Sequence, residues 1–434
     1  MGKVYIETYG CQMNVADTEV VFAILGKEGY SRTDDPAQAD VILVNTCSVR
    51  DNAEQRIWGR IEQFQFQRKK RPGVLVGILG CMAERLKDAL LESGKVDVVA
   101  GPDAYRSLPR LLAAAATGHP QIDVLLSGEE TYGDIAPLRL DGNGVSAFIS
   151  IMRGCNNVCS YCVVPYTRGA ERSRDWRTIV REACECAQAG YKEVTLLGQN
   201  VDSYRDGEVG FARLLALVAE AVPGLRIRFS TSNPQDISDA VLETMAAHAN
   251  ICRHIHLPVQ SGSDRMLEKM RRRYTRAGYL ERVAKIRSLM PDCAITTDVI
   301  AGFCSETEED HRDTLSLFEA VGFDAAFMFQ YSERPGTLAA RKYPDDVPPE
   351  VKNRRLEEII ALQNRLSLES NRRDVGKTFR VLVEGPSKRD PDRLCGRNSQ
   401  NKMCVWPDTA HRAGDFVEVT VEDCTQATLL CKLA

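Results

Sequence analysis

The first 130 residues alternate between short apolar runs and amphipathic segments. Runs typical of buried strands cover residues 3–9, 40–45, 73–79 and 96–99. Segments whose apolar residues recur every three or four positions, as on a half-buried helix, cover residues 15–27, 52–67, 83–91 and 105–116. Strands that alternate with helices are typical of a parallel sheet with helices on both faces. We therefore expect a doubly wound α/β domain over residues 1–130.

A second series of the same kind follows residues 131–144, which are rich in Gly, Asp and Pro and predict a linker. Its strand patterns cover residues 147–152, 193–197, 225–229, 254–257, 294–299 and 325–329. Its helix patterns cover residues 178–189, 211–221, 240–247, 279–289 and 308–321, before a long charged helix at 350–373. Six such strands with helices between them predict a partial (β/α)6 barrel within residues 131–374.

The pattern changes again after Gly376, where the strand-like runs become short. They cover residues 378–384, 403–406, 415–421 and 427–432, with turns expected at 385–386, 396–398 and 414–415. Several short strands joined by turns predict a small β-barrel over residues 375–434. Barrels of this size often bind oligonucleotides.

The composition narrows the class of protein. A length of 434 residues suits two to four domains, and 44% hydrophobic with 27% charged residues is ordinary for a folded soluble chain. No apolar stretch approaches the ~18 residues of a membrane helix, and the first residues do not resemble a signal peptide. We expect a cytoplasmic protein that binds no membrane. Because the net charge is −4, nucleic-acid binding would need a local basic patch.

Fifteen cysteines are many for a cytosolic chain, and they favour metal or catalytic thiolates over disulfides. Cys155, Cys159 and Cys162 have the spacing C-x3-C-x2-C. One short loop of this kind can hold three irons of a cubane cluster and leave the fourth iron open. A zinc knuckle normally needs a fourth ligand nearby, so the iron–sulfur interpretation is favoured.

Cys11, Cys47 and Cys81 each come directly after one of the first three strands. The carboxyl ends of parallel strands share one edge of a sheet, so we expect these thiols to converge. Gly10 and Gly80 allow a sharp turn before two of them. Three thiolates alone do not choose between zinc and an iron–sulfur cluster with an open iron, and each cysteine could instead be a packing residue.

The C-x3-C-x2-C spacing resembles the cluster motif of radical S-adenosylmethionine (SAM) enzymes, and the order of the three regions resembles the methylthiotransferase family. Within that family, several stretches look most similar to the branch that modifies an isopentenylated tRNA adenosine. They are residues 8–14, 45–50, 162–169, 197–201 and 331–337. The branches that modify a threonylcarbamoylated tRNA adenosine or a ribosomal-protein aspartate are the alternatives.

The resemblance implies two iron–sulfur clusters, both expected to be of the 4Fe–4S type. Cys155, Cys159 and Cys162 would hold the cluster that binds SAM and generates a radical, and Cys11, Cys47 and Cys81 would hold an auxiliary cluster that handles the inserted sulfur. Tyr161 would lie against the adenine of SAM. The other implied SAM contacts follow strands of the barrel, although each could be an ordinary loop residue: Gly198, Gln199, Asn200, Ser230, Ser232 and Gln260.

The C-terminal barrel resembles a TRAM domain, an RNA-binding module. Residues 371–402 carry nine basic and four acidic residues in a chain that is acidic overall. The expected phosphate contacts are Lys377, Arg380, Lys388, Arg389, Arg397 and Lys402. The implied partners are the tRNA anticodon loop, an external electron donor and a sulfur or cluster carrier, and we expect a monomer. A protein-docking barrel is the alternative.

Two further features have alternative interpretations. Residues 265–276 hold six bases and one acid, which fits a solvated helix face or a phosphate contact. The nine remaining cysteines are interpreted as packing residues; a zinc site among Cys395, Cys404, Cys424 and Cys431 lacks a C-x2-C pair. The non-enzymatic alternative for the whole chain is a zinc-containing RNA-binding protein.

Overall fold

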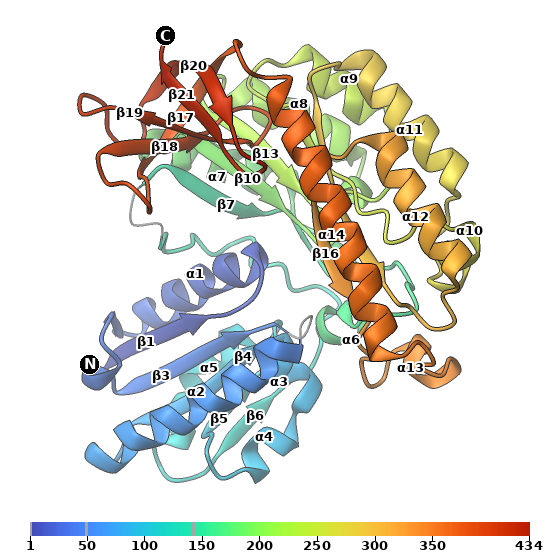
Figure 1. The fold of residues 1–434 in the computed structure, drawn as a ribbon. Helices are drawn as coiled ribbons and strands as arrows, with labels where there is room; N and C mark the ends of the chain where they lie inside the picture. The colour runs from blue at the N-terminus through green and yellow to red at the C-terminus, as the bar shows by residue number, and fades with distance from the viewer. Residues whose placement is uncertain (1, 48–50, 141–143) are drawn as a thin grey trace.

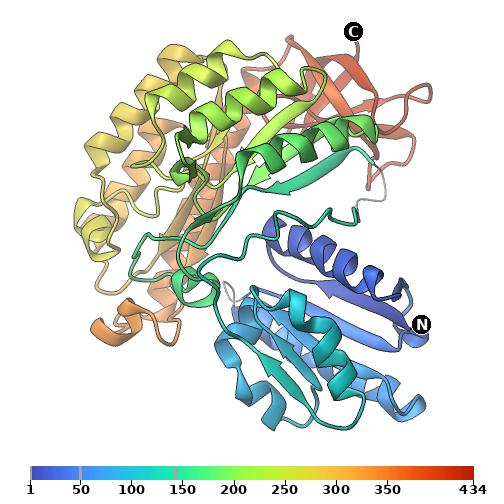
Figure 2. The same cartoon turned by 180° about the vertical axis from the view of Figure 1, so that it is seen from behind.

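The computed structural model describes residues 2–47, 51–140 and 144–434, and of residues 51–54 it describes the backbone alone (Figure 1). The last three residues of the 45–50 motif and residues 141–143 of the expected linker therefore lie outside the described residues. Seen from both sides, the N-terminal region and the C-terminal barrel lie at different ends of the central region (Figures 1 and 2).

The N-terminal region is a six-stranded parallel sheet in the order β2-β1-β3-β4-β5-β6. Its strands are β1 (Lys3–Thr8), β2 (Ser31–Arg32), β3 (Val41–Thr46), β4 (Leu75–Gly80), β5 (Val98–Ala100) and β6 (Gln121–Asp123). Its helices are α1 (Gln12–Lys27), α2 (Asp51–Lys70), α3 (Cys81–Leu86), α4 (Asp88–Glu92) and α5 (Leu108–Ala115).

Alternate residues of the central strands pack on opposite faces of this sheet. Val41 and Leu43 join the core beneath α1 and α5, whereas Ile42 and Val44 join the core beneath α2, α3 and α4. The expected doubly wound architecture is thus confirmed. The sequence pattern missed β2 and β6, because runs of two and three residues at a sheet edge bury too little to show a period.

The strand order reverses at β1, because the chain passes outward to β2 before it returns to β3. Connections leave the sheet in opposite directions at such a switch point, and a crevice opens at the carboxyl ends of the two strands. Cys11 follows β1 and Cys47 follows β3, so both flank this crevice, and Cys81 is the first residue of α3 after β4.

The central region has six parallel strands in two groups of three. One group has the order β13-β10-β7 and the other β14-β15-β16, and a parallel bridge between Ile227 and Ile251 joins them. The strands are β7 (Ser146–Ser150), β10 (Glu193–Leu197), β13 (Arg226–Ser230), β14 (His254–His256), β15 (Ala294–Ala301) and β16 (Ala325–Gln330). The main helices around them are α7 (Trp176–Gln188), α8 (Phe211–Ala221), α9 (Asp239–Ala247), α11 (Arg276–Leu289) and α12 (Glu308–Val321). This arrangement confirms the partial (β/α)6 barrel.

The C-terminal region is a closed barrel in the order β17-β18-β19-β21-β20. Its strands are β17 (Thr378–Pro386), β18 (Arg393–Arg397), β19 (Met403–Pro407), β20 (Phe416–Cys424) and β21 (Leu429–Leu433). The turn expected at residues 396–398 is partly wrong, since Gly396 and Arg397 end β18. A Cβ on Gly396 would overlap the carbonyl oxygen of Leu382 on β17, so this position of the strand requires glycine. Because glycine has no apolar side chain, the strand shows little apolar pattern in the sequence.

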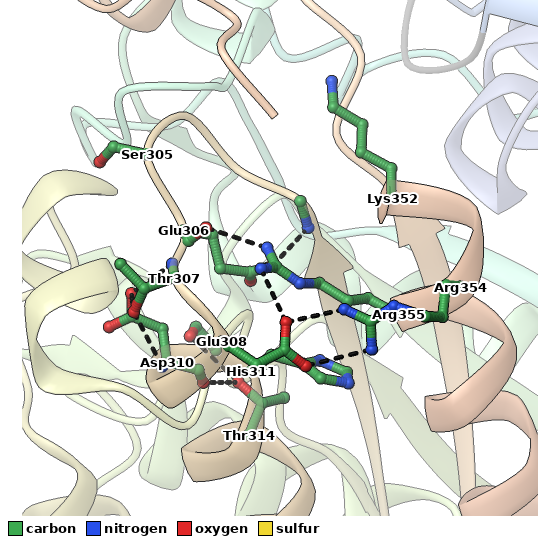
Figure 3. A network of polar contacts seen from close by, with 12 residues as sticks. Ser305, Glu306, Thr307, Glu308, Asp310, His311, Thr314, Lys352, Arg354 and Arg355 are labelled. Carbon is green, nitrogen blue, oxygen red and sulfur yellow. Dashed lines mark hydrogen bonds and ion pairs between the residues drawn. The ribbon is translucent and has the colours of Figure 1, made fainter. Parts of the chain in front are cut away.

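The long helix α14 (Pro349–Arg372) connects the barrel mouth to the C-terminal barrel (Figure 1). Near its start, Arg355 donates to Glu306 (2.9 Å) and to Glu308 (3.2 Å) in the loop after β15 (Figure 3). Near its end, Asn371 Nδ2 donates to the carbonyl of Thr425 (2.8 Å). The helix is therefore fixed at both ends by buried polar contacts.

The stretch expected to be a linker is packed rather than loose. Tyr132 and Ile135 are buried in the core of the N-terminal region. Arg139 donates to Glu19 of α1 (2.9 Å) and to the carbonyl of Phe148 on β7 (2.7 Å). The apolar residues of this segment pack on the core of the N-terminal region, and Arg139 contacts both α1 and β7. The segment therefore joins the first region to the second through packed contacts.

Candidate active site

The C-x3-C-x2-C loop leaves the barrel through a short hairpin of β8 (Met152–Arg153) and β9 (Arg172–Ser173), with α6 (Val164–Arg168) between the loop and β9. Cys155 N donates to the carbonyl of Gly169, and Cys162 N to that of Cys159, both at 3.1 Å. Gly154 has a φ of +78°, and a Cβ there would overlap the carbonyl oxygen of Ala170. Only glycine allows the two sides of the hairpin to approach this closely.

Ser160 anchors the middle of this loop to the mouth of the barrel. Its side chain is fully buried, its Oγ donates to the carbonyl of Lys269 (2.8 Å), and its carbonyl accepts from Ala339 N (2.7 Å). On the same side, Arg272 Nη1 donates to Cys159 Sγ (3.3 Å). The three thiols thus sit at the carboxyl ends of the barrel strands, where ligands of such barrels bind.

The environment of this triad opposes ionisation. Burial raises the pKa of Cys155 to about 11, and burial with the neighbouring Cys159 raises the pKa of Cys162 to about 12. Both thiols are therefore protonated at neutral pH in the metal-free protein. A metal that binds them must displace these protons.

The second triad forms where three strand ends of the N-terminal sheet meet. Cys11 is exposed at the N-cap of α1, whereas Cys47 and Cys81 are 8% and 6% exposed. A Cβ on Gly10 would lie 2.5 Å from Cys47 Cβ, and one on Gly80 would lie 2.6 Å from the carbonyl oxygen of Thr46. These turns are in direct contact, so the expected convergence of the strand ends is present.

A buried amide ties the first two turns together. Asn14 Nδ2 donates to Asn45 Oδ1 (3.2 Å) and to the carbonyl of Thr46 (3.0 Å), while Asn45 Nδ2 donates to the carbonyl of Asn14 (2.9 Å). Asn14 and Asn45 are fully buried. The start of α1 is thereby joined to the end of β3 next to Cys11 and Cys47.

The environment of Cys11 favours its thiolate. A hydrogen bond with Cys47 and the positive charge of Arg168 together lower the pKa of Cys11 to about 6, although desolvation by the neighbouring protein groups acts in the opposite direction. A thiolate is the form that binds metals. The protein therefore lowers the pKa of Cys11 in the auxiliary triad and raises the pKa of Cys155 and Cys162 in the other triad.

Within the described residues, no three His, Cys, Asp or Glu side chains come close enough to hold a single metal ion. This applies also to the four cysteines of the C-terminal barrel, for which zinc was considered. A cubane cluster offers a different iron atom to each thiolate, so its ligands are spaced more widely than those of one ion. Three cysteines without a fourth protein ligand are the donor set of a 4Fe–4S cluster with one open iron.

The implied SAM contacts lie along the carboxyl ends of β10 and β13. Gln199 Oε1 and Asn200 Oδ1 are buried and accept no hydrogen bond from any described residue. Buried amide oxygens without partners are rare in folded proteins, and they fit a site for a polar ligand such as SAM. Asp202 beside them was missed by the sequence analysis; burial raises its pKa to about 7.

Three of the implied contacts have local roles as well. A Cβ on Gly198 would lie 2.5 Å from Met152 Cγ, so packing alone requires a glycine there. Gln260 has a φ of +69° and pairs with β15 through its backbone. Tyr161, between two cluster cysteines, meets the edge of Phe303 with ring centroids 6.5 Å apart.

A cavity of about 1210 Å³ connects the three regions of the molecule. It reaches Cys11 of the N-terminal region, Ser230 and Phe327 of the barrel strands, and Gln400 of the C-terminal barrel. Phe327 is 57% exposed, which is unusual for a large aromatic side chain. The cavity is large enough for several groups of a polymeric substrate.

The six expected RNA contacts do not share one environment. Lys388 and Arg389 are exposed after β17, and Arg380 lies over the ring of Phe416 (4.2 Å). The other three form ion pairs: Lys377 with Asp374, Arg397 with Glu384, and Lys402 with Asp374 and Asp324.

Most basic side chains of the run at residues 265–276 are paired within the protein, although none of them is fully buried. Arg265 pairs with Asp310, and Arg276 donates to the carbonyls of Gly262 and Asp313. Among the described residues of this run, only the side chains of Arg271 and Arg273 are exposed and lack an ion pair or hydrogen bond. These two residues still fit either a solvated helix face or a phosphate contact.

A buried network of charges next to both triads was also missed. Asp17 of α1 accepts from Arg153 (2.7 Å) and Arg168 (2.8 Å), and Asp103 pairs with Arg172 (3.0 Å). The arginines flank the C-x3-C-x2-C motif in sequence, which was the available signal. Nothing in the sequence linked them to Asp17, an unremarkable acid on a predicted helix.

Comparison with known families divides the chain into three matches. Residues 3–101 match the model described as "Uncharacterized protein family UPF0004", residues 149–318 match the radical SAM superfamily, and residues 372–433 match the TRAM domain.

Curated relatives match the chain over nearly its full length. A protein of Bacteroides fragilis is 58% identical over 98% of this chain and 94% of its own, and one of Amoebophilus asiaticus is 57% identical over 99% and 92%. One of Porphyromonas gingivalis is 56% identical over 98% and 94%. All three are named tRNA-2-methylthio-N(6)-dimethylallyladenosine synthase.

Solved structures share the fold. The radical SAM methyltransferase TsrM from Kitasatospora setae has a TM-score of 0.60 at 15% identity, covering 78% of this chain and 77% of that one. The cobalamin-dependent radical SAM enzyme OxsB has a TM-score of 0.55 at 12% identity, covering 84% and 56%. Among the described residues, no helix is long and apolar enough to cross a membrane.

Proposed function

Because the chain belongs to the tRNA-2-methylthio-N(6)-dimethylallyladenosine synthase family of radical SAM enzymes, we propose that it replaces the C2 hydrogen of N6-isopentenyladenosine beside the tRNA anticodon with a methylthio group. The observation that carries the proposal is the presence of two cysteine triads joined through the short helix α6. One triad suits radical generation and the other suits a site for sulfur. Relatives of the same name support this branch over the two alternative substrates.

In this proposal, Cys155, Cys159 and Cys162 hold a 4Fe–4S cluster with one iron open to SAM. When bound there, the cluster and SAM supply a radical strong enough to remove hydrogen from an aromatic carbon, which acid–base chemistry cannot do. The surrounding residues position the reactants. Arg272 donates to a cluster cysteine, and Tyr161 faces the adenine of SAM.

The polar groups after the strands orient the rest of SAM. The unpartnered oxygens of Gln199 and Asn200 accept hydrogen bonds from the amino or hydroxyl groups of SAM. Ser230, Ser232 and Gln260 complete the same set of polar contacts. Burial of these contacts excludes water and so protects a reactive species from side reactions. Gly198 allows the close approach of the neighbouring strand.

Cys11, Cys47 and Cys81 hold the auxiliary cluster and the sulfur that is inserted. Their crevice opens into the cavity that runs along the barrel strands to the C-terminal barrel. A substrate base that enters this cavity can therefore meet Cys11 of the auxiliary triad and Ser230, which follows a strand of the radical SAM barrel.

The C-terminal barrel binds the tRNA through phosphate contacts. Lys388 and Arg389 are the most accessible of the expected contacts, because the ion pairs of Lys377, Arg397 and Lys402 compete with phosphate. The target base lies in a single-stranded loop, so it leaves its stack at low cost. The proposal also includes an external electron donor, a sulfur or cluster carrier, a monomeric state and a cytoplasmic location. It divides the chain at residues 130 and 374.

The test is nucleoside analysis by mass spectrometry. Reconstituted protein is incubated without oxygen with SAM, a reductant and isopentenylated tRNA that lacks the methylthio group. We expect the methylthio nucleoside, and none with the matched C155A variant. SAM cleavage without this product would leave the radical site standing and reject the substrate. No SAM cleavage by protein with verified iron content would reject the proposal.

A further inference from the structure

Arg168, the last residue of α6, has an environment that the proposed function does not explain. Its side chain is 4% exposed, and its Nη2 donates to Asp17 Oδ2 at 2.8 Å. Asp17 Oδ1 accepts from Arg153 at 2.7 Å, so one carboxylate serves two buried guanidinium groups. Among the described residues, Asp17 is the one acidic partner of Arg168, and it is shared with Arg153, which also lies 3.5 Å from Asp103. With Arg172 on Asp103, three guanidinium groups face two carboxylates, so the cluster carries excess positive charge.

The other nitrogen of this guanidinium, Nη1, is buried and has no hydrogen-bond partner among the described residues. A buried N–H without an acceptor is costly, and it is worse on a charged group. An acceptor that the protein itself does not provide would remove this cost.

The auxiliary cysteines lie on the elements around Arg168 and are candidates to hold such an acceptor. Helix α6 packs against α3, whose first residue is Cys81. Asp17, which holds Arg168, lies on α1, and Cys11 caps the start of that helix. Cys81 and Cys11 are also among the groups whose charges act most strongly on Arg168.

We infer that Arg168 is a positioning residue of the auxiliary site, and that its free N–H donates to anionic sulfur held by Cys11, Cys47 and Cys81. This inference rests on the proposed function, because it needs a cluster in that triad. A guanidinium keeps its charge at every physiological pH, so its field on the site is permanent. It favours the more negative state of the site and the binding of an anionic sulfur ligand such as sulfide.

Arg172 offers a matched control in the same network. It is also buried and also paired with an aspartate of the N-terminal region, Asp103, at 3.0 Å. The charges that act most strongly on it are those of Asp103, Arg153 and Tyr132, and no cysteine is among them. A role limited to joining the two regions would be shared by both arginines, whereas a role at the auxiliary site belongs to Arg168 alone.

The experiment uses the full chain with C155A, C159A and C162A, so that only the auxiliary triad can bind iron. R168Q, R168K and R172Q are added singly, and iron content, reduction potential by spectroscopic titration and sulfide affinity are measured. We expect R168Q to keep its iron, since Asp17 remains paired with Arg153. Its reduction potential should fall, and sulfide should bind about 10-fold or more weakly, as expected for a lost hydrogen bond to a charged group.

R168K should stay close to the parent in potential because it keeps the charge, and R172Q should match the parent in both readouts. If the parent triple variant binds no iron, the assignment of the auxiliary triad is wrong. If it binds iron but R168Q leaves potential and sulfide affinity unchanged, or R172Q shifts them equally, the inference about Arg168 is wrong. Should R168Q lose iron, R168K decides: iron retention with the parent potential supports the inference, and iron loss in both R168K and R172Q rejects it.

Discussion

The two cysteine triads are built in opposite ways. Cys155, Cys159 and Cys162 lie in one loop that a hairpin and a buried serine hold at the barrel mouth. Cys11, Cys47 and Cys81 come from three separate turns that only the sheet brings together. The first triad depends on local geometry, and the second depends on the correct assembly of a whole domain.

Their electrostatics differ as well. Burial raises the pKa of Cys155 and Cys162 and keeps these two thiols protonated, whereas Cys47 and Arg168 lower the pKa of Cys11 and favour its thiolate. The difference suits the two tasks. A site that binds anionic sulfur gains from a nearby cation, while a radical site gains from exclusion of water.

Substitution of the cysteines is the strongest way to separate the triads. C155A should abolish SAM cleavage and therefore all product. C47A should leave SAM cleavage within about 2-fold of the parent and abolish methylthiolation, because the radical site is intact. Deoxyadenosine and the methylthio nucleoside are quantified in the same reaction. Full product formation by both variants would overturn the assignment.

The glycines before the cysteines should separate the triads nearly as well. G10A forces a Cβ against Cys47 at a φ of +129°, and G154A forces one into the carbonyl of Ala170. Each should lower the free energy of unfolding of the metal-free protein by about 3 kcal/mol. G10A should lose iron from the auxiliary triad alone, and G154A from the radical triad alone.

The control for this pair is G73A, at a φ of +103° with no atom within 4 Å of a new Cβ. It should cost only about 1 kcal/mol and keep both sites. Denaturant titration and iron analysis give the readouts. If G73A loses as much iron as G10A, backbone strain rather than contact with Cys47 is responsible.

Thiol alkylation should distinguish the triads by pH in metal-free protein. With a pKa of about 6, Cys11 is mostly thiolate at pH 7, and its rate should level off above that pH. With a pKa of about 11, Cys155 should keep gaining about tenfold per pH unit through pH 9. Because a less basic thiolate is less nucleophilic, the net advantage of Cys11 at pH 7 is roughly 30- to 100-fold. Mass-spectrometric mapping after a short pulse of iodoacetamide measures it, and equal rates would contradict the assigned environments.

The smallest effect should come from the polar ties beside the triads. N14A removes a buried amide between the start of α1 and the end of β3 and should cost about 2 kcal/mol. N156A removes the exposed hydrogen bond that the Glu171 backbone N–H donates to Asn156 Oδ1 in the radical loop, and it should cost no more than about 0.5 kcal/mol. Denaturation of the two metal-free variants side by side compares them. A larger cost for N156A would mean that the local loop is the more fragile of the two.

Much of this architecture was predictable. Strand–helix alternation predicted the sheet and the partial barrel, because buried faces impose a period on the sequence. The C-x3-C-x2-C motif was recognisable because its ligands are close in sequence. Edge strand β2 and strand β18 were missed, since the first is too short and the second uses a glycine where a strand pattern would show an apolar residue.

The site was predictable only in part. The placement of Cys11, Cys47 and Cys81 after strands predicted that they converge, since parallel strands share one carboxyl edge. No pattern along the chain indicated the strand reversal at β1 that opens the crevice between Cys11 and Cys47. The roles of the implied SAM and RNA contacts stay predictions.

Most helices and strands, the cysteine motif and the family resemblance could be found from the sequence, because periodicity and local spacing are properties of neighbouring residues. The tertiary structure alone decided that Asp17 meets Arg153 and Arg168, residues 136 and 151 positions away. It also decided that three regions share one cavity and that Arg168 retains an unpaired N–H. Such contacts form between residues far apart in sequence when domains pack against each other. No periodicity or residue spacing along the chain indicates which buried charges will pair.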